Sequence, residues 1–387
     1  MTRIAFVHNG FPAGGAERIT LDIARYLAPS GGYEIFVYAT HIGSLAEEDA
    51  GCLTLRKIPS QAIQPRRSRV IESLLLSDHI DILVEVTKSL HDIERIRART
   101  GVKTVLACHG EVFWQRYVIM HRRRKKKLLW TLFYRHWYAD GTLALRKAQR
   151  RTLFDYEHCD AYTVLCQEYK CQLERDLGIA PDTSHVFVIE NPERAVPSPV
   201  LDKEKMILFC GRFENWSKRI DRLLRIWAEV QDRMPEWRLV LVGDGPDMGG
   251  IRELAERLAL KRISFEGRRS DVFAYYDRAS VVCLTSQTEG WPLALSEGQA
   301  RGCIGVAFGC TAGVREILSP SGENGYIVRP FDEKEFATAL LEIASSDEDA
   351  LRRIRINGME KRRQYLPEII AQKWKVLFDK LMHNEDI

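Results

Sequence analysis

Short runs of apolar residues recur along the chain, and stretches with helical periodicity separate them. In the first half, the pattern predicts a helix at 16–27 and strands at 4–7, 34–38, 53–57, 80–85, 103–108, 162–165 and 186–189. In the second half, it predicts a helix at 221–234 and strands at 206–210, 239–242, 263–266, 281–284 and 304–307. Such alternation of buried strands and helices is typical of parallel sheets wrapped by helices.

The pattern is interrupted at residues 192–199, which contain three prolines and opposite charges and read as a linker. A chain of 387 residues is also too long for one typical core. We therefore predict an N-terminal domain at 1–195 and a C-terminal domain at 200–365. The amphipathic last helix, within 366–387, should pack back toward the first domain. The predicted fold is α/β, with two Rossmann-like, doubly wound domains facing each other across a cleft.

Composition supports a globular protein, since 45% of residues are hydrophobic and 28% are charged. The nine cysteines show neither CxxC nor Cys/His metal spacing, and several lie inside predicted strands. This usage predicts reduced thiols and a cytoplasmic location. The first residues run directly into a strand, so we expect no signal peptide, and no apolar run reaches membrane-spanning length.

Positive charge is concentrated in an arm at about 112–151. Between Arg116 and Arg151 stand twelve Lys and Arg residues and one acid, a net charge of +11, whereas the whole chain carries +4. The arm includes the unbroken basic run 122–127, and Trp, Tyr, Phe and Leu residues are interleaved with it. This composition favours contact with an anionic membrane surface. A solvated helical arm and nucleic-acid binding remain alternatives, but no nucleic-acid motif accompanies the charge, so we expect no nucleic-acid partner.

Two carboxylates flank the end of the predicted strand at 281–284. Glu289 falls on the following loop, where open α/β sheets bind ligands, and Glu297 lies about two turns away on a helix that opens near Pro292. The backbone N–H groups at that helix start would suit a phosphate. The residues between the carboxylates that we expect at the ligand are Gly290, Trp291, Pro292 and Leu293. A nucleotide sugar fits this arrangement, although two glutamates near a helix start are also common on solvated surfaces.

Other candidate residues also follow predicted strands. Arg212 and Lys218 follow the strand at 206–210 and could neutralise a diphosphate, unless they belong to an ordinary surface loop. Gly14 and Gly15 form a turn after the first strand that could approach phosphate or sugar, or could be a tight turn without a ligand. The remaining candidates are His109, which ends the strand at 103–108, and Gly267, which could let backbone approach a base.

Together these motifs resemble the retaining glycosyltransferases of family four, which have the GT-B fold. The segments that carry the resemblance are Gly14-Gly15-Ala16-Glu17-Arg18, His109-Gly110, Gly211-Arg212 with Lys218, Gly243-Asp244-Gly245, Glu289-Gly290-Trp291-Pro292 through Glu297, and Asn324-Gly325. The chain departs from the family at Trp291-Pro292, where Phe-Gly is frequent, and at Gly298, where Ala is usual.

The resemblance implies roles for these residues. Glu289 would contact the donor sugar and Glu297 the ribose hydroxyls. Arg212 and Lys218 would bind the diphosphate, and His109 would lie beside the transferred sugar.

The implied reaction moves a hexose from a nucleotide diphosphate sugar, UDP-linked or alternatively GDP-linked, to a glycan acceptor with retention of anomeric configuration. The leaving diphosphate itself would take the acceptor proton. No Asp-x-Asp motif follows a strand, so we expect neither a metal ion nor another cofactor. With the basic arm, the motifs predict a peripheral enzyme on the inner face of the cell membrane that extends a lipid-linked glycan of lipopolysaccharide, capsule or exopolysaccharide. A nucleotide-sugar 2-epimerase of the same fold and a non-catalytic nucleotide-sugar or glycan sensor are the alternatives.

Overall fold

The computed structural model describes residues 1–12, 15–45, 49, 51–59, 64–86, 89–90, 92–119, 142–193, 196 and 199–383, without the side chains of 64–66. The chain divides into two compact units. Unit 1 consists of Met1–Pro192 and Pro367–Ile387, and unit 2 of Glu193–Leu366. The last helix therefore belongs to the unit that contains the first strand.

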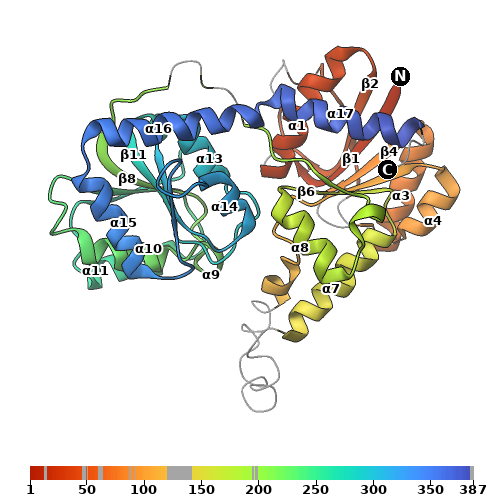
Figure 1. The fold of residues 1–387 in the computed structure, drawn as a ribbon. Coiled ribbons are helices and arrows are strands. Elements are labelled where there is room, and N and C mark those ends of the chain that lie inside the picture. Colours follow the sequence, from red (N-terminus) through yellow and green to blue (C-terminus); the bar gives the residue numbers. More distant parts are fainter. Residues whose placement is uncertain are drawn as a thin grey trace. The chain divides into compact units, whose positions relative to one another are not determined.

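The sheet of unit 1 is parallel throughout its described strands, in the order β3-β2-β1-β4-β5-β6-β7 (Figure 1). These strands are β1 (Thr2–Phe11), β2 (Tyr33–Ile42), β3 (Thr54–Lys57), β4 (Ile82–Val86), β5 (Lys103–Ala107), β6 (Ala161–Val164) and β7 (Val186–Val188). The order reverses direction between β1 and β4, which marks the switch point where such sheets bind ligands.

Helices lie between most of the strands that follow one another in the chain, because parallel neighbours need a long crossover connection. They are α1 (Gly15–Leu27), α3 (Gln64–Ser77), α4 (Ile93–Thr100), α7 (Thr142–Glu157), α8 (Gln167–Leu177) and the 3₁₀ turns η1 (Ala28–Ser30) and η2 (Pro181–Thr183). The last helix, α17 (Pro367–His383), lies alongside α1 (Figure 1). Its Trp374 ring meets Phe6 of β1 edge-on at 6.5 Å between ring centroids.

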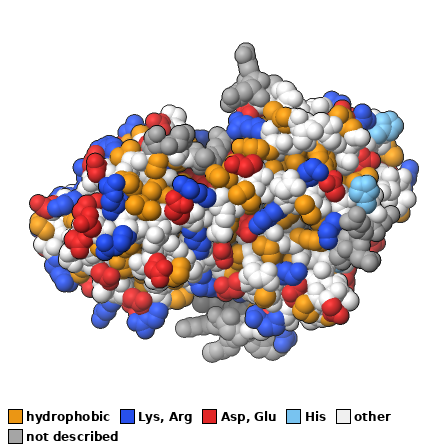
Figure 2. Space-filling model, turned by 45° about the horizontal axis from the view of Figure 1, so that its top comes forward, with side chains coloured by type: hydrophobic (Ala, Val, Ile, Leu, Met, Phe, Trp, Pro, Cys, Tyr) orange, Lys and Arg blue, Asp and Glu red, His pale blue; other side chains and the backbone are white. Residues whose placement is uncertain are grey.

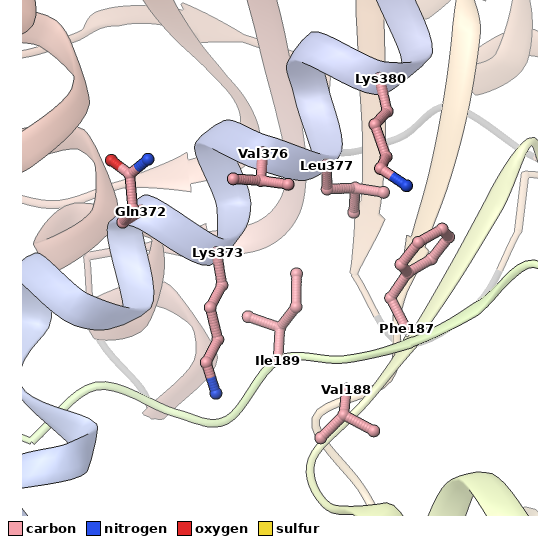
Figure 3. A pocket seen from close by; sticks show the side chains of 8 residues that line it. All are labelled: Phe187, Val188, Ile189, Gln372, Lys373, Val376, Leu377 and Lys380. Atoms are coloured by element: carbon pink, nitrogen blue, oxygen red, sulfur yellow. The ribbon is translucent and has the colours of Figure 1, made fainter. Parts of the chain in front are cut away.

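A groove of about 320 Å³ separates α17 from β7 and the residue that follows it (Figure 3). Apolar side chains line most of it, namely Phe187, Val188, Ile189, Val376 and Leu377. Lys373 and Lys380 also line it, and Lys373 donates to Glu190 at 2.5 Å. The last helix and the edge of the sheet therefore face each other here with mostly apolar side chains.

The sheet of unit 2 is also parallel across its described strands, in the order β10-β9-β8-β11-β12-β13 (Figure 1). The strands are β8 (Glu204–Cys210), β9 (Arg238–Val242), β10 (Ile263–Gly267), β11 (Ala279–Leu284), β12 (Ile304–Phe308) and β13 (Tyr326–Val328). Its switch point lies between β8 and β11. The helices are α9 (Asn215–Lys218), α10 (Ile220–Val230), α11 (Met248–Arg257), α12 (Phe273–Arg278), α13 (Leu293–Ala300), α14 (Ala312–Leu318), α15 (Glu333–Ser345), α16 (Glu348–Arg362) and the 3₁₀ turn η3 (Arg363–Tyr365).

The predicted α/β class is confirmed, and the predicted strands are found with small shifts at their ends. β4 begins at Ile82, not at Ile80, because the Ile80 N–H closes helix α3 by donating to the Leu75 carbonyl. α10 ends at Val230 instead of residue 234. Residue 234 precedes Pro235, and a proline disfavours helical backbone at the residue before it. The short strand β13 was not predicted.

The helices that the structure describes differ from membrane spans in length or hydropathy. None of these helices combines the length and the apolar character that crossing a membrane requires. On the face shown in Figure 2, Lys and Arg side chains are interspersed with Asp and Glu. Residues 120–141, which hold the predicted basic run, lie outside the described part of the chain.

One buried carboxyl in unit 1 has unusual surroundings. Glu85 on β4 is 1% exposed, and one of its oxygens accepts from the Leu90 N–H. The other oxygen is buried without a hydrogen-bond partner in the described part of the chain. Burial, with a smaller contribution from the nearby Asp155 carboxylate, raises the pKa of Glu85 to about 8. Glu85 is therefore protonated in the folded protein at neutral pH.

This pKa predicts a pH-dependent effect of Glu85→Gln. The unfolded chain loses the Glu85 proton near its ordinary pKa of 4.5, while the folded chain keeps it up to about 8. The stability that this proton contributes is complete below the unfolded pKa and falls by about 1.4 kcal/mol per pH unit until the folded pKa is passed. Glutamine cannot ionise, so the variant should gain stability relative to the parent between about pH 5.5 and about pH 8.5. Thermal unfolding at both pH values measures the gain, and an equal difference at both would contradict it.

Candidate active site

The loops after β8 and β11 meet at the switch point of the unit 2 sheet. β8 ends at Cys210 and is followed by Arg212, and β11 ends at Leu284 and is followed by Glu289. Because β8 and β11 are parallel neighbours, their carboxyl ends lie at the same edge of the sheet. The topology thus brings together two segments that are about seventy residues apart in sequence.

Lys218 and Glu289 form the central ion pair of this edge. The Lys218 Nζ lies 2.7 Å from Glu289 Oε1, and the Ser286 hydroxyl donates to the same oxygen at 2.6 Å. The Glu289 side chain is 10% exposed and the Lys218 side chain 27%. This pair, held by a neighbouring hydroxyl, presents a fixed cation and a fixed carboxylate to a ligand.

Two hydrogen bonds to backbone carbonyls hold the β11–α13 loop against α9 and the residue that follows it. The Gln287 N–H donates to the Ser217 carbonyl at 2.6 Å, and the Thr285 hydroxyl donates to the Arg219 carbonyl at 2.9 Å. Lys218 stands between these two carbonyls. The positions of Lys218 and Glu289 are therefore set by the backbone as well as by their own contact.

Arg212 projects from the β8 loop with its side chain 68% exposed, and its described ionic contact is Glu214 at 3.9 Å. The preceding Gly211 is packed tightly, because a Cβ on Gly243 would lie 1.8 Å from the Gly211 carbonyl oxygen. Gly243 has φ of +137°, which only glycine adopts readily. The Gly243-Asp244-Gly245 turn thus fixes the base of the Arg212 loop and leaves its side chain open to a ligand.

Glu297 lies on α13, where a buried tyrosine reaches it. The Tyr276 hydroxyl lies 3.4 Å from Glu297 Oε2, and burial, reinforced by nearby Cys210 and Glu297, raises the pKa of Tyr276 well above its usual value. The hydroxyl therefore stays protonated and donates to the carboxylate. Burial also raises the pKa of the neighbouring Cys210 thiol to about 11, so Cys210 is no thiolate nucleophile at neutral pH.

The segment between the two glutamates depends on close packing. A Cβ on Gly313 of α14 would lie 1.9 Å from the Gly290 carbonyl oxygen. Trp291 is 6% exposed and meets the Tyr365 ring edge-on at 5.2 Å between centroids, so its ring packs inside unit 2. Gly298 replaces the usual alanine for a similar reason, since a Cβ there would lie 2.7 Å from Val282 Cγ1.

The other predicted residues of this unit also have defined places. Pro292 is the N-cap of α13 and Leu293 its first residue, so the predicted helix start is confirmed to within one residue. Gly267 ends β10 with φ of +69°, and its Cβ position faces open space. Its carbonyl accepts from the Gly243 N–H, which places it at the same sheet edge as the Arg212 loop.

In unit 1, His109 follows β5 at the carboxyl edge. Its Nδ1 lies 2.9 Å from Asn191 Oδ1, so Nδ1–H donates to the amide oxygen and Nε2 is left as an acceptor. Burial lowers the pKa of His109 to about 4, against smaller opposing effects of Asn191 and Glu17. The imidazole is therefore neutral at physiological pH.

A second histidine, near the end of β1, was missed from the sequence. His8 is 4% exposed, its Nε2 lies 2.9 Å from the Thr20 hydroxyl, and its Nδ1 lies 3.7 Å from Glu17 Oε1 on α1. Partial burial would raise the pKa of Glu17, but hydrogen bonding, first with His8, outweighs it and lowers the pKa. Gly15 begins α1 beside this group, whereas Gly14 lies outside the described residues.

Unit 2 therefore brings together Lys218 and Glu289 by direct contact, and places Arg212, Gly267 and Glu297 at the same edge of its sheet. Sequence reasoning missed Ser286 and Tyr276, which hold the two carboxylates. Ser286 could have been found from its position three residues before Glu289, but Tyr276 lies on a separate short helix that no motif marks. In the described part of the chain, no group of three or more His, Cys, Asp or Glu residues is placed to hold a metal ion.

Comparison with known protein families matches both units. Residues 13–192 match the model of "Glycosyltransferase Family 4", and residues 204–346 match that of "Glycosyl transferases group 1". The two matched regions are consecutive and together span most of the chain.

Two curated relatives match this chain over most of the length of both proteins. An uncharacterized glycosyltransferase of Haemophilus influenzae is 27% identical over 87% of this chain and 88% of its own. The Campylobacter jejuni enzyme "GalNAc-alpha-(1->4)-GalNAc-alpha-(1->3)-diNAcBac-PP-undecaprenol alpha-1,4-N-acetyl-D-galactosaminyltransferase" is 23% identical over 97% of both chains.

Among solved structures, HepE of Anabaena in complex with UDP-glucose matches 98% of this chain and 100% of its own with a TM-score of 0.72 and 16% identity. At that identity the likeness shows the fold. The family models and the fold agree: this chain belongs to the family four glycosyltransferases and has the GT-B fold. It is a glycosyltransferase.

The approach of α14 to Gly290 predicts the effect of Gly313→Ala. Because the added Cβ would meet backbone, the loop must shift, and we expect a loss of about 1–3 kcal/mol in stability. Gly250→Ala in α11 is the matched control, since a Cβ there meets nothing within 4 Å and should stabilise the helix by about 0.5–1 kcal/mol. Chemical denaturation measures both. A Gly313→Ala variant as stable as the parent would show that the close approach is not required.

Proposed function

We propose that this glycosyltransferase moves a hexose from a nucleotide diphosphate sugar to a glycan acceptor, with retention of the anomeric configuration. The observation that carries the proposal is the contact of Lys218 with Glu289 at the switch point of the unit 2 sheet. A cation and a carboxylate fixed side by side suit a ligand that has a diphosphate next to a sugar hydroxyl.

The residues of unit 2 take roles by position and charge. Lys218 and the exposed Arg212 would neutralise the diphosphate, and the N–H groups at the start of α13, at Leu293, would support it. Glu289, with Gly290 and Trp291, would bind the sugar, Glu297 the ribose hydroxyls, and Gly267 the base. In unit 1, we assign His109 to the transferred sugar, where its neutral Nε2 would accept from a hydroxyl, and Gly14 and Gly15 to the turn that approaches the ligand.

In the proposed reaction the bond between the anomeric carbon and the diphosphate oxygen breaks. The acceptor oxygen bonds to the same face of that carbon, and its proton passes to the leaving diphosphate. Arg212 and Lys218 would stabilise the charge that grows on the diphosphate, so the protein supplies alignment and electrostatic stabilisation without a strong base. The proposal involves no metal ion and no other cofactor.

The relatives suggest a donor and an acceptor. The HepE structure contains UDP-glucose, which supports a UDP-sugar as the first donor to test, with a GDP-sugar as the second. The name of the Campylobacter jejuni enzyme specifies an undecaprenol-linked acceptor, which supports a lipid-linked glycan of lipopolysaccharide, capsule or exopolysaccharide. We therefore place the enzyme on the inner face of the cell membrane, as a peripheral protein in the cytoplasm.

The function is tested by a thermal-shift screen of UDP, GDP, ADP and their sugars, followed by product analysis. A nucleotide that binds the folded state should raise the melting temperature. The matching sugar should then be transferred only when a glycan acceptor is present, with the donor's anomeric configuration found in the product by NMR. Conversion of the donor sugar without an acceptor would instead indicate an epimerase, and binding without any turnover would indicate a sensor.

Arg212→Ala should reduce kcat by roughly 10²–10³ if Arg212 stabilises charge on the leaving group. Its side chain is mostly exposed, so the melting temperature should stay near that of the parent. Arg238→Ala is a control, since Arg238 lies at the amino end of β9, away from the binding edge, and pairs with Glu204. A folded Arg212→Ala enzyme with the parental kcat would remove Arg212 from this role.

For the basic arm, we expect binding to anionic vesicles that weakens as salt is added. Replacing all six cations of residues 122–127 by Gln should abolish this binding. The control replaces six exposed cations of unit 2, which are Arg233, Arg257, Arg268, Lys334, Arg352 and Arg353, and changes the net charge equally. Equal sedimentation of the parent protein with anionic and neutral vesicles would exclude an electrostatic anchor.

A further inference from the structure

An arginine outside the predicted motifs reaches the loop that carries Glu289. Arg222 lies in the first turns of α10, and it is 7% exposed although it is a cation on an amphipathic helix. Its Nη2 donates to Gln287 Oε1 at 2.9 Å, and its Nη1 donates to the Thr285 carbonyl at 3.4 Å. Both acceptors belong to the segment between β11 and Glu289.

Two aromatic rings hold the Arg222 guanidinium in place. Its carbon lies 4.2 Å from the centroid of the Phe331 ring and 5.8 Å from that of Phe308, distances at which a cation is attracted to a ring. Phe331 has φ of +67°, a left-handed conformation that is costly for a bulky residue, and its side chain is still 40% exposed. The fold thus keeps a strained residue whose ring covers Arg222.

The same loop is bonded on its other side to the segment that carries Lys218. While Gln287 accepts from Arg222 through its side chain, its N–H donates to the Ser217 carbonyl. Thr285 likewise accepts from Arg222 through its carbonyl, while its hydroxyl donates to the Arg219 carbonyl. Arg222 therefore contacts the two loop residues that join the Glu289 side of the site to the Lys218 side.

The next cation of the same helix makes different contacts. Arg225 pairs with Glu333 at 2.6 Å and with Asp221 at 3.1 Å, and among the described residues its hydrogen bonds do not reach the β11–α13 loop. Like Arg222, it is an arginine of helix α10. Replacing Arg225 therefore removes a cation from α10 without removing a contact to the loop.

We propose that Arg222 is a positioning residue for glycosyl transfer, acting through Gln287 and Thr285 to hold Glu289 and Lys218 at their observed separation. This proposal rests on the proposed function, since it assigns the ion pair to donor sugar and diphosphate. Arg222 does not touch the reacting atoms in this role. Its loss should affect kcat, which depends on alignment, more than the binding of the nucleotide, whose ribose and base contacts lie on other segments.

The first test is a kinetic comparison of Arg222→Leu, Gln287→Leu, the double variant and Arg225→Leu. We expect Arg222→Leu to lower kcat by roughly 10- to 100-fold, with the donor KM changed by less than about threefold. Gln287→Leu should act in the same direction, and the double variant should be about as slow as the slower single variant, because both break one connection. Arg225→Leu should keep the parental kcat, and Arg222→Lys should recover part of the loss.

The second test measures the loop itself, by amide hydrogen exchange of residues 285–291 in the protein without ligand. Exchange should be faster in Arg222→Leu and Gln287→Leu than in the parent and in Arg225→Leu. This readout also applies if Arg222→Leu is too unstable for kinetics, because Gln287→Leu removes the shorter of the two Arg222 contacts to the loop.

Any of three results would overturn the positioning role. They are a parental kcat in folded Arg222→Leu, effects that multiply in the double variant, and amide exchange that is unchanged in Arg222→Leu and Gln287→Leu. Failure of the parent protein to transfer sugar from any donor would overturn the proposed function instead. In that case the exchange measurement still decides whether Arg222 holds the loop.

Discussion

The site depends on one contact between two segments that the chain order keeps far apart. Lys218 and Glu289 meet at 2.7 Å because β8 and β11 are parallel neighbours, so the loops after both strands emerge at the same edge. All the described strands of this parallel sheet end at that edge, and a crevice for a ligand opens where the strand order reverses direction. The position of the ion pair is therefore a consequence of topology, and the same topology puts Arg212 and Gly267 at the same edge of the sheet.

The second requirement at this edge is that the backbones of neighbouring segments come close together. A Cβ on Gly243 would come within 1.8 Å of the Gly211 carbonyl oxygen, and one on Gly313 within 1.9 Å of the Gly290 carbonyl oxygen. The first contact fixes the loop of Arg212, and the second fixes the segment between Glu289 and Glu297. The glycines thus act from outside the ligand-binding segments, as spacers that let loops from neighbouring strands pack at backbone distance.

Much of this could be predicted from sequence, because strand ends are well marked. Buried apolar runs gave the strands, and the polar residues after them, such as Arg212 and Glu289, fell at the carboxyl edge by the rule for parallel sheets. Their pairing could not be derived in the same way. Periodicity locates a strand but does not say which strand it pairs with, so the contact of Lys218 with Glu289 required the strand order.

Arg222 shows a harder limit. It lies in the segment Ile220–Val230, where Arg222 and Arg225 are three residues apart on an amphipathic helix and have the same side chain. Arg222 is followed at i+4 and i+8 by the buried Ile226 and Val230, whereas Arg225 lies at i+4 from Asp221 and i−4 from Glu229. Periodicity can therefore tell the two apart, but it does not name their partners: Arg222 is buried beneath Phe331 and bonded to the loop, while Arg225 is paired with Glu333. The ring that packs on Arg222 belongs to Phe331, a residue more than one hundred positions away whose left-handed backbone no sequence signal marks. A positioning contact of this kind is a property of tertiary packing, so it becomes visible only when the neighbouring elements are in place.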